Sequence, residues 1–224
     1  MSRLAPEQYA VYLVTDDPSR YAGDFLASVD AAVAGGVTLV QYRDTESDDR
    51  TRYERCLALR HLLSARGVPL VVNNRVDLAL AVGADAVHVG QDDLPPAAVR
   101  RLVGPALDIG WSVRNEAEAR STDAALVDAV GVGPVFDARA TKADAADALG
   151  PAGLRAALKA LPRRPDGTRL ATVAIGGIHA GNAAAVFACG VDGVSVVSAF
   201  SKAADPAAVA RRFRELAGDG RRLP

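Results

Sequence analysis

The chain has 224 residues, of which 50% are hydrophobic and 24% are charged, and this composition fits one large globular domain or two small ones. Its formal net charge is −1 and its lysines and arginines are scattered, which argues against a nucleic-acid-binding protein. The first residues form no apolar signal segment, and no run reaches the roughly 18 apolar residues of a membrane span. We therefore expect a cytoplasmic protein with small-molecule partners, no nucleic acid and no membrane.

Strands and helices are expected to alternate along the whole chain. Apolar and β-branched runs predict strands at residues 9–15, 37–42, 68–72, 86–89, 108–113, 127–132, 170–175 and 193–197. Helical spacing, opening prolines and closing glycines predict helices at residues 24–34, 48–66, 76–82, 95–104, 151–161 and 205–216. Two further helices are expected, a short one that begins at residue 115 and one that ends at residue 189. The loop at residues 133–150 is longer than most such connections, which is typical of a functional lid. The tail from about residue 218 is expected to fray.

Eight strands that are each followed by a helix match the count and size of a compact (β/α)8 TIM barrel. We predict a single barrel domain over residues 1–224. A doubly wound open sheet is the alternative, but no G-x-G-x-x-G motif opens the first helix.

Polar residues follow most of the predicted strands, and the carboxyl ends of parallel strands meet on one rim. The carboxylates and amides suit Mg²⁺, and the cations suit phosphate. Together with the glycines and the valine that follow the last two strands, the residues expected on this rim are Asp16, Asp17, Gln41, Arg43, Asp44, Asn73, Asn74, Gln91, Asp92, Asp93, Ser112, Thr141, Lys142, Gly176, Gly177, Val197 and Ser198.

Three of these positions, and His88 within a strand, carry specific expectations. Asp93 alone would be a helix N-cap, but its place beside the strand-end asparagines favours a metal ligand. Gly177 and Ser198 follow the last two strands, where many barrels bind phosphate through backbone N–H groups. His88 lies inside a strand between two valines and is expected to pack within the barrel.

Seven collinear segments together resemble the thiamine-phosphate synthase family. They are Y-L-V-T-D at 12–16, Q-Y-R-D at 41–44, N-N-R-V-D-L-A-L-A-V-G-A-D-A-V-H-V-G-Q-D-D at 73–93, V-G-V-G-P-V-F at 130–136, T-K-A-D-A at 141–145, A-I-G-G-I at 174–178 and D-G-V-S-V-V-S-A at 192–199. The resemblance implies a barrel enzyme that joins a pyrimidine pyrophosphate to a thiazole phosphate and releases pyrophosphate. It also implies a dissociative displacement assisted by Mg²⁺.

The resemblance implies roles for individual residues as well. The metal ligands would be Asn74 and Asp93, and the residues acting on the departing pyrophosphate would be Arg43, Ser112 and Lys142. The remaining substrate contacts would come from Gln41, Tyr42, Asp44, Thr45, Asn73, Arg139, Thr141, Gly177, Val197 and Ser198. A homodimer is one state that the sequence allows.

The chain departs from the family pattern at three places. The family usually has Lys at the position of Thr45 and often Asp at that of Asn74, and its Thr-x-Thr-Lys loop reads Ala-Arg-Ala-Thr-Lys at 138–142. One hypothesis is that Arg139 replaces the cation missing at Thr45.

Two alternatives stay open at the level of sequence. One is the related thiazole tautomerase, which has His where this chain has Pro134. The other is a non-catalytic relative that binds thiamine intermediates.

Overall fold

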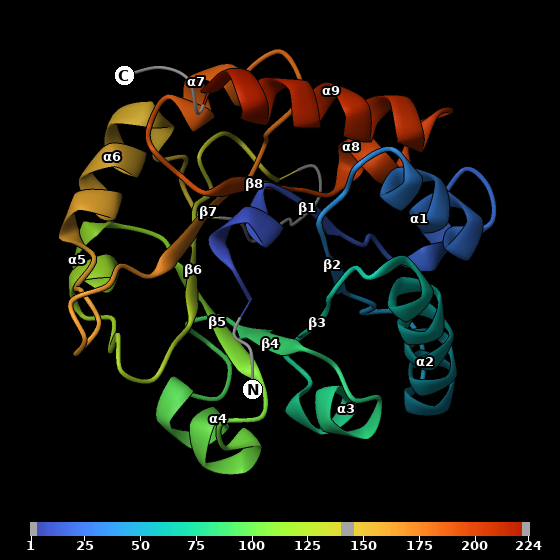
Figure 1. Cartoon of the computed structure of the whole chain (residues 1–224), viewed down its shortest axis with the longest axis horizontal. Coiled ribbons are helices and arrows are strands. Elements are labelled where there is room, and N and C mark those ends of the chain that lie inside the picture. Colours follow the sequence, from blue (N-terminus) through green and yellow to red (C-terminus); the bar gives the residue numbers. More distant parts are fainter. Residues whose placement is uncertain (1–3, 140–145, 221–224) are drawn as a thin grey trace.

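The structure is a computed structural model that describes residues 4–139 and 146–220. Eight parallel strands pair in chain order, and β8 pairs with β1 to close the barrel. Helices surround the strands, and the short η1 lies across one end of the barrel (Figure 1). The predicted TIM barrel is therefore confirmed, and the open doubly wound sheet is wrong.

The elements alternate as the sequence predicts. The strands are β1 (Val11–Val14), β2 (Leu39–Tyr42), β3 (Leu70–Asn73), β4 (Ala86–Val89), β5 (Asp108–Val113), β6 (Ala129–Val132), β7 (Ala171–Ile175) and β8 (Gly193–Val196). The helices are η1 (Pro6–Tyr9), η2 (Pro18–Arg20), α1 (Phe25–Ala34), α2 (Asp49–Arg66), α3 (Val76–Ala81), α4 (Pro96–Val103), α5 (Glu116–Arg120), α6 (Gly150–Ala160), α7 (Ala183–Phe187), α8 (Ser198–Ser201) and α9 (Pro206–Gly220).

Local signals explain several of these boundaries. The Asp48 carboxylate accepts a hydrogen bond from the Thr51 N–H at 2.9 Å and caps the start of α2. The same helix ends at Gly67, whose φ of 66° lies in the left-handed region. The predicted strand at residues 9–15 is shorter in the structure, because Tyr9 belongs to η1. Helix α9 continues beyond residue 216, where its end is predicted.

The core has two parts because strand side chains alternate between the two faces of the sheet. The outer part lies between the strands and the helices and contains most of the buried aliphatic side chains. The inner part fills the amino-terminal half of the barrel. Its members are Tyr9, Tyr12, Val14, Leu39, Val71, Ala86, Ala129, Ala171 and Val173. Because η1 supplies Tyr9, that end is closed by packed side chains.

A repeated hydrogen bond fixes the starts of the strands. The residue immediately before each even-numbered strand accepts a bond from a backbone N–H at the start of the preceding odd-numbered strand. The pairs are Thr38 with Val11, Asp85 with Leu70, Asp128 with Ile109 and Asp192 with Thr172, at 2.8–2.9 Å. Because these side-chain oxygens accept N–H groups at the starts of the strands, they satisfy donors there and hold neighbouring strands together.

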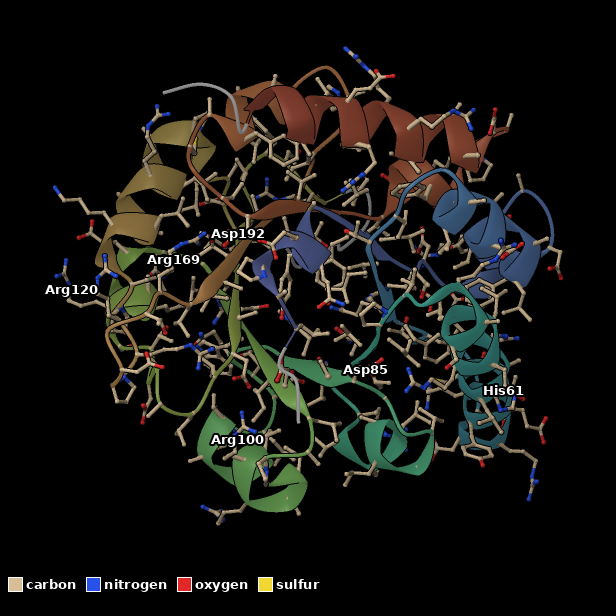
Figure 2. The ribbon with its side chains drawn as sticks, viewed as in Figure 1. His61, Asp85, Arg100, Arg120, Arg169 and Asp192 are labelled. Carbon is tan, nitrogen blue, oxygen red and sulfur yellow. The ribbon has the colours of Figure 1, made fainter. Side chains whose placement is uncertain are left out.

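Each of the three aspartates in this repeat also pairs with an arginine. Arg60 contacts Asp85, Arg100 contacts Asp128 and Arg169 contacts Asp192, each at 2.6 Å. Figure 2 labels Asp85, Arg100, Arg169 and Asp192 around the barrel. Within residues 4–139 and 146–220, no helix has the length and apolar character needed to cross a membrane.

Candidate active site

The carboxyl ends of the strands open into a cavity of about 510 Å³, a size typical of small-molecule sites. Its floor is apolar, formed by Val14, Val71, Ala86, Ala129 and Val173 of the inner core. Its wall contains ten of the predicted site residues: Gln41, Arg43, Thr45, Asn73, Asn74, Asp93, Ser112, Gly177, Val197 and Ser198. The converging carboxyl ends of the strands therefore bring together residues that are up to 157 positions apart in the chain, from Gln41 to Ser198.

Arg43 and Thr45 are held by the end of β1. The Arg43 backbone N–H donates to Thr15 Oγ1 at 2.8 Å, and the same hydroxyl donates to the Arg43 carbonyl at 2.8 Å. The Thr45 N–H and hydroxyl both donate to the buried Asp17 carboxylate. Arg43 Nη1 lies 3.7 Å from Asp17 Oδ2. The segment after β2 is thus fixed at the rim with a guanidinium in the cavity wall.

Tyr42 and Asp44 lie outside the cavity lining, although both are predicted site residues. They alternate with Gln41 along the strand and therefore face the helices. The Tyr42 hydroxyl donates to Asp44 Oδ2 at 2.9 Å, and Arg55 pairs with the same oxygen at 2.6 Å. Burial opposes the charged carboxylate, but hydrogen bonds from Ser47, Tyr42 and Arg55 outweigh it and lower the pKa of Asp44. This placement supports a structural role for the pair.

Gln41 faces the cavity and bonds to a neighbouring tyrosine. Its Nε2 donates to the Tyr12 hydroxyl at 2.7 Å, an amide orientation assigned from the hydrogen-bond network. Burial raises the pKa of Tyr12, so its hydroxyl stays protonated. In this orientation Gln41 Oε1 is the atom available to accept a hydrogen bond from a ligand.

His88 also faces the cavity, where it contacts a predicted site residue. Its Nε2 lies 2.8 Å from Ser112 Oγ, and the ring sits over Gly110 and Gly131 of the next two strands. A Cβ at Gly110 would lie only 2.3 Å from His88 Nδ1, so that position leaves room for the ring. Burial lowers the pKa of His88 to about 4. At neutral pH the imidazole is therefore uncharged and orients the Ser112 hydroxyl.

Asn74 and Asp93 both line the cavity. Asn74 has a φ of 60°, and its N–H donates to the His88 carbonyl at 2.8 Å. Asp93 Oδ2 accepts the Gly90 N–H at 2.8 Å. Within the described ranges no cluster of three His, Cys, Asp or Glu side chains forms. One carboxylate and one amide oxygen fit Mg²⁺, which commonly keeps waters and substrate phosphate oxygens in its octahedral shell.

Gly176 and Gly177 form a tight turn after β7. Their φ values are 99° and 62°, and a Cβ on either would come within 2.7 Å of atoms in the segment after β6. The Phe136 N–H donates to the Gly176 carbonyl at 3.0 Å. Close approach of two backbones therefore requires glycine here. The same turn brings Gly177 to the cavity wall with Val197 and Ser198.

The loop after β6 contains the remaining predicted residues. Arg139 is half exposed and pairs with Asp147 at 2.8 Å and with Asp137 at 3.6 Å. It is absent from the cavity lining, although Ala138 and Ala146 belong to it. Thr141 and Lys142 lie outside the described residues.

The cavity lining also contains polar residues that were not predicted as site residues, among them Tyr12, His88, Ser195 and Arg114. Tyr12, His88 and Ser195 face inward from the strands, and Arg114 follows β5. The Ser195 hydroxyl is buried without a hydrogen-bond partner in the part of the chain that the structure describes. The alternation of side chains between the two faces of a strand would have predicted Tyr12, His88 and Ser195. The position directly after a strand would have predicted Arg114.

Comparison with known proteins gives consistent matches over nearly the whole chain. A family model described as thiamine monophosphate synthase matches residues 11–200. A thiamine-phosphate synthase of Laribacter hongkongensis is 49% identical over 212 residues, which are 94% of this chain and 96% of that protein. One from Desulfitobacterium hafniense strain Y51 is 45% identical over 93% of this chain and 97% of that protein. A solved thiamine phosphate pyrophosphorylase from Pyrococcus furiosus superposes with a TM-score of 0.83 at 32% identity, over 96% and 98% of the two chains.

Proposed function

The chain belongs to the thiamine monophosphate synthase family, and we propose that its cavity residues carry out the family's reaction in a specific division of roles. It is a thiamine-phosphate synthase, a transferase of thiamine biosynthesis. The substrates are a hydroxymethylpyrimidine pyrophosphate and a thiazole phosphate, and the products are thiamine phosphate and pyrophosphate. The relatives' names and coverage leave the tautomerase and the non-catalytic binder without support.

The observation that carries the assignment of roles is the composition of the cavity wall. Arg43, Asp93 and Ser112 approach one space from three strand ends above an apolar floor. The buried histidine there is a weak base, since its pKa is about 4. A displacement that begins with departure of pyrophosphate suits this set, because it needs stabilisation of negative charge rather than removal of a proton.

The reaction has two bond changes. The bond between the pyrimidine methylene carbon and the pyrophosphate oxygen breaks, and its electron pair leaves with the oxygen. The thiazole nitrogen then attacks the methylene carbon with its lone pair. Negative charge grows on the leaving oxygen, so we assign Arg43, Ser112 and Lys142 to that group. Thr141 would instead face the thiazole phosphate.

The substrate rings and the second phosphate are assigned to other parts of the wall. Gln41 and Asn73 would bind the pyrimidine through their amide groups. Gly177, Val197 and Ser198 would bind the thiazole phosphate, since backbone N–H groups at a glycine turn suit an anion.

Asn74 and Asp93 would hold Mg²⁺. When bound, the ion would neutralise charge on the pyrophosphate oxygens, and the side chains supply hard oxygen ligands suited to it. Cytoplasmic location and a homodimer both stay predictions.

Pyrophosphate release tests this division of roles directly. The assay contains both substrates and Mg²⁺, with one control lacking the thiazole phosphate and another containing a chelator. Arg43→Ala should lower turnover at least tenfold, because a cation next to the developing charge is lost. Arg101→Ala is the matched control, since that arginine is exposed on α4. Equal activity of the two variants would exclude Arg43 from the reaction.

A further inference from the structure

Arg43 carries an unsatisfied hydrogen-bond donor in the cavity wall. Its Nη1 is buried and has no hydrogen-bond partner within residues 4–139 and 146–220. The carboxylate paired with it, Asp17 Oδ2, is 3.7 Å away, which is within ion-pair range but too long for a hydrogen bond. The Arg43 side chain as a whole is 24% exposed and lines the cavity, so the exposed part of the guanidinium can meet a ligand oxygen while Nη1 stays beside Asp17.

Asp17 is itself tightly fixed. Its side chain is 1% exposed, and it follows β1 in the rim. Both of its carboxylate oxygens accept from the Thr45 hydroxyl at 3.0 Å, and Oδ1 also accepts the Thr45 N–H. Arg20 Nη2 also lies 3.8 Å from Oδ2. The carboxylate is therefore an anchored anion whose position does not depend on Arg43.

The contacts of Thr45 explain why the Arg43 pair is loose. Thr45 uses acceptor sites on both Asp17 oxygens, so the carboxylate has less capacity for a close two-bond pair with a guanidinium. The Arg43 backbone is already held by Thr15. Asp17 is thus the charged group that restrains the Arg43 side chain without satisfying Nη1.

From this geometry we propose that Asp17 is a positioning residue that holds the Arg43 guanidinium ready for a pyrophosphate oxygen. The inference rests on the proposed function, in which Arg43 binds the leaving group. A guanidinium that is restrained before binding loses less conformational entropy when the anion arrives. A close ion pair would have to be broken first, and the 3.7 Å pair avoids that loss.

The change in pyrophosphate affinity of one variant, Asp17→Asn, distinguishes a positioning role of Asp17 from a purely electrostatic one. If Asp17 were only a negative charge near the site, Asp17→Asn would tighten binding of inorganic pyrophosphate by removing repulsion. If it positions Arg43, the same variant binds pyrophosphate about tenfold more weakly. Isothermal titration of the full chain with pyrophosphate and Mg²⁺ measures the difference. Unchanged or tighter binding overturns the proposal.

Glu46→Gln is the control, since it also removes one negative charge from the segment after β2. Glu46 is exposed, accepts from Ser19 and pairs with Arg20, and it has no contact to Arg43 among the interactions of the described residues. This control should not weaken pyrophosphate binding. In an Arg43→Ala background, Asp17→Asn should no longer weaken it either, because the residue being positioned is gone. Equal weakening in both backgrounds overturns the proposal.

Two further measurements keep the test decisive. Thermal unfolding checks that each variant folds, and Asp17→Glu replaces Asp17→Asn if the latter does not. The longer carboxylate reaches Arg43 more closely, so it should also weaken pyrophosphate binding, and unchanged or tighter binding by this variant overturns the proposal. Product formation by the unmodified chain tests the proposed function separately. If that chain makes no thiamine phosphate but the binding results hold, the function fails and the positioning role stands.

Discussion

Acid sensitivity of the fold should depend on His88. The pKa of its imidazole is about 4 in the folded protein, against 6.5 for an ordinary histidine, because the ring is buried. Between these values the unfolded chain binds a proton that the folded chain does not. Stability therefore rises with pH through this window and is lost as the pH falls from about 6.5 to about 4.

The size of the effect follows from the shift. At 1.36 kcal/mol for each pKa unit, the difference between about 4 and 6.5 corresponds to roughly 3 kcal/mol as an upper value. Part of the ring surface opens to the cavity, so water there screens some of the cost, and we expect about 2 kcal/mol. Below pH 4 both states are protonated and the histidine adds no further pH dependence.

The measurement is urea unfolding of the unmodified chain and of His88→Gln at several pH values between 7.5 and 4. Glutamine keeps a polar group near Ser112 but does not titrate. The free energy of unfolding should fall by about 2 kcal/mol more in the unmodified chain over this range. His61→Gln is the control, since His61 is exposed on the outer helix α2 (Figure 2). Parallel pH profiles for the unmodified chain and His88→Gln would refute the reasoning.

The other predictions concern the cavity and its loop. Asp93→Asn should raise the magnesium concentration for half-maximal turnover at least tenfold, since it removes the carboxylate ligand, and an unchanged titration would reject that role. Lys142→Ala should lower kcat more than it raises KM, because charge on the leaving group grows in the transition state; the reverse pattern would count against it. Arg139→Ala should leave turnover within about twofold, because its guanidinium is paired with loop aspartates, whereas a large loss would support compensation for the cation missing after β2. Gly110→Ala should destabilise the fold by about 1–3 kcal/mol in urea unfolding, since its Cβ would overlap the His88 ring, and a stability equal to that of the unmodified chain would show that the ring moves freely.

The fold could be predicted because each boundary has a local cause. Buried apolar runs form the strands, and glycines or aspartates at helix ends stop or start the helices, as at Asp48 and Gly67. A closed barrel could be predicted from the eight strand–helix units and from the absence of a dinucleotide-binding motif. The exact strand starts did not follow, because tertiary contacts decide them, as when Tyr9 enters η1 instead of β1.

The site could be predicted only where one rule was sufficient. Strand ends identified Arg43, Asn74 and Asp93, which all line the cavity. All residues from the end of β2 to Thr45 were predicted to lie in the site, although alternate residues there face opposite sides of the sheet. Tyr42 and Asp44 were therefore included. Applying the two-residue period would have separated them.

Contacts between distant segments were beyond the sequence. The bond from Thr45 to Asp17 joins residues 28 positions apart and depends on the register of β1 against β2. From sequence alone, Thr45 is only a position where the positive charge of the family's usual lysine is missing. In the structure it is a donor that fixes a carboxylate beside Arg43, and only the three-dimensional arrangement gives it that role.

The two ends of the barrel use the same residue types for opposite purposes. Before the strands, Asp85 and Asp192 each have an arginine at 2.6 Å and a backbone N–H at 2.8 Å, so their charges are fully used in closing the sheet. After the strands, Arg43 has its carboxylate at 3.7 Å and one unsatisfied nitrogen. A ligand anion could bind a closely paired arginine only after the ion pair is broken. It can bind an arginine whose carboxylate partner is not within hydrogen-bond distance without that loss. Composition cannot distinguish these two kinds of pair, whereas position relative to the strand does, because residues before a strand meet the packed end and residues after it meet the cavity.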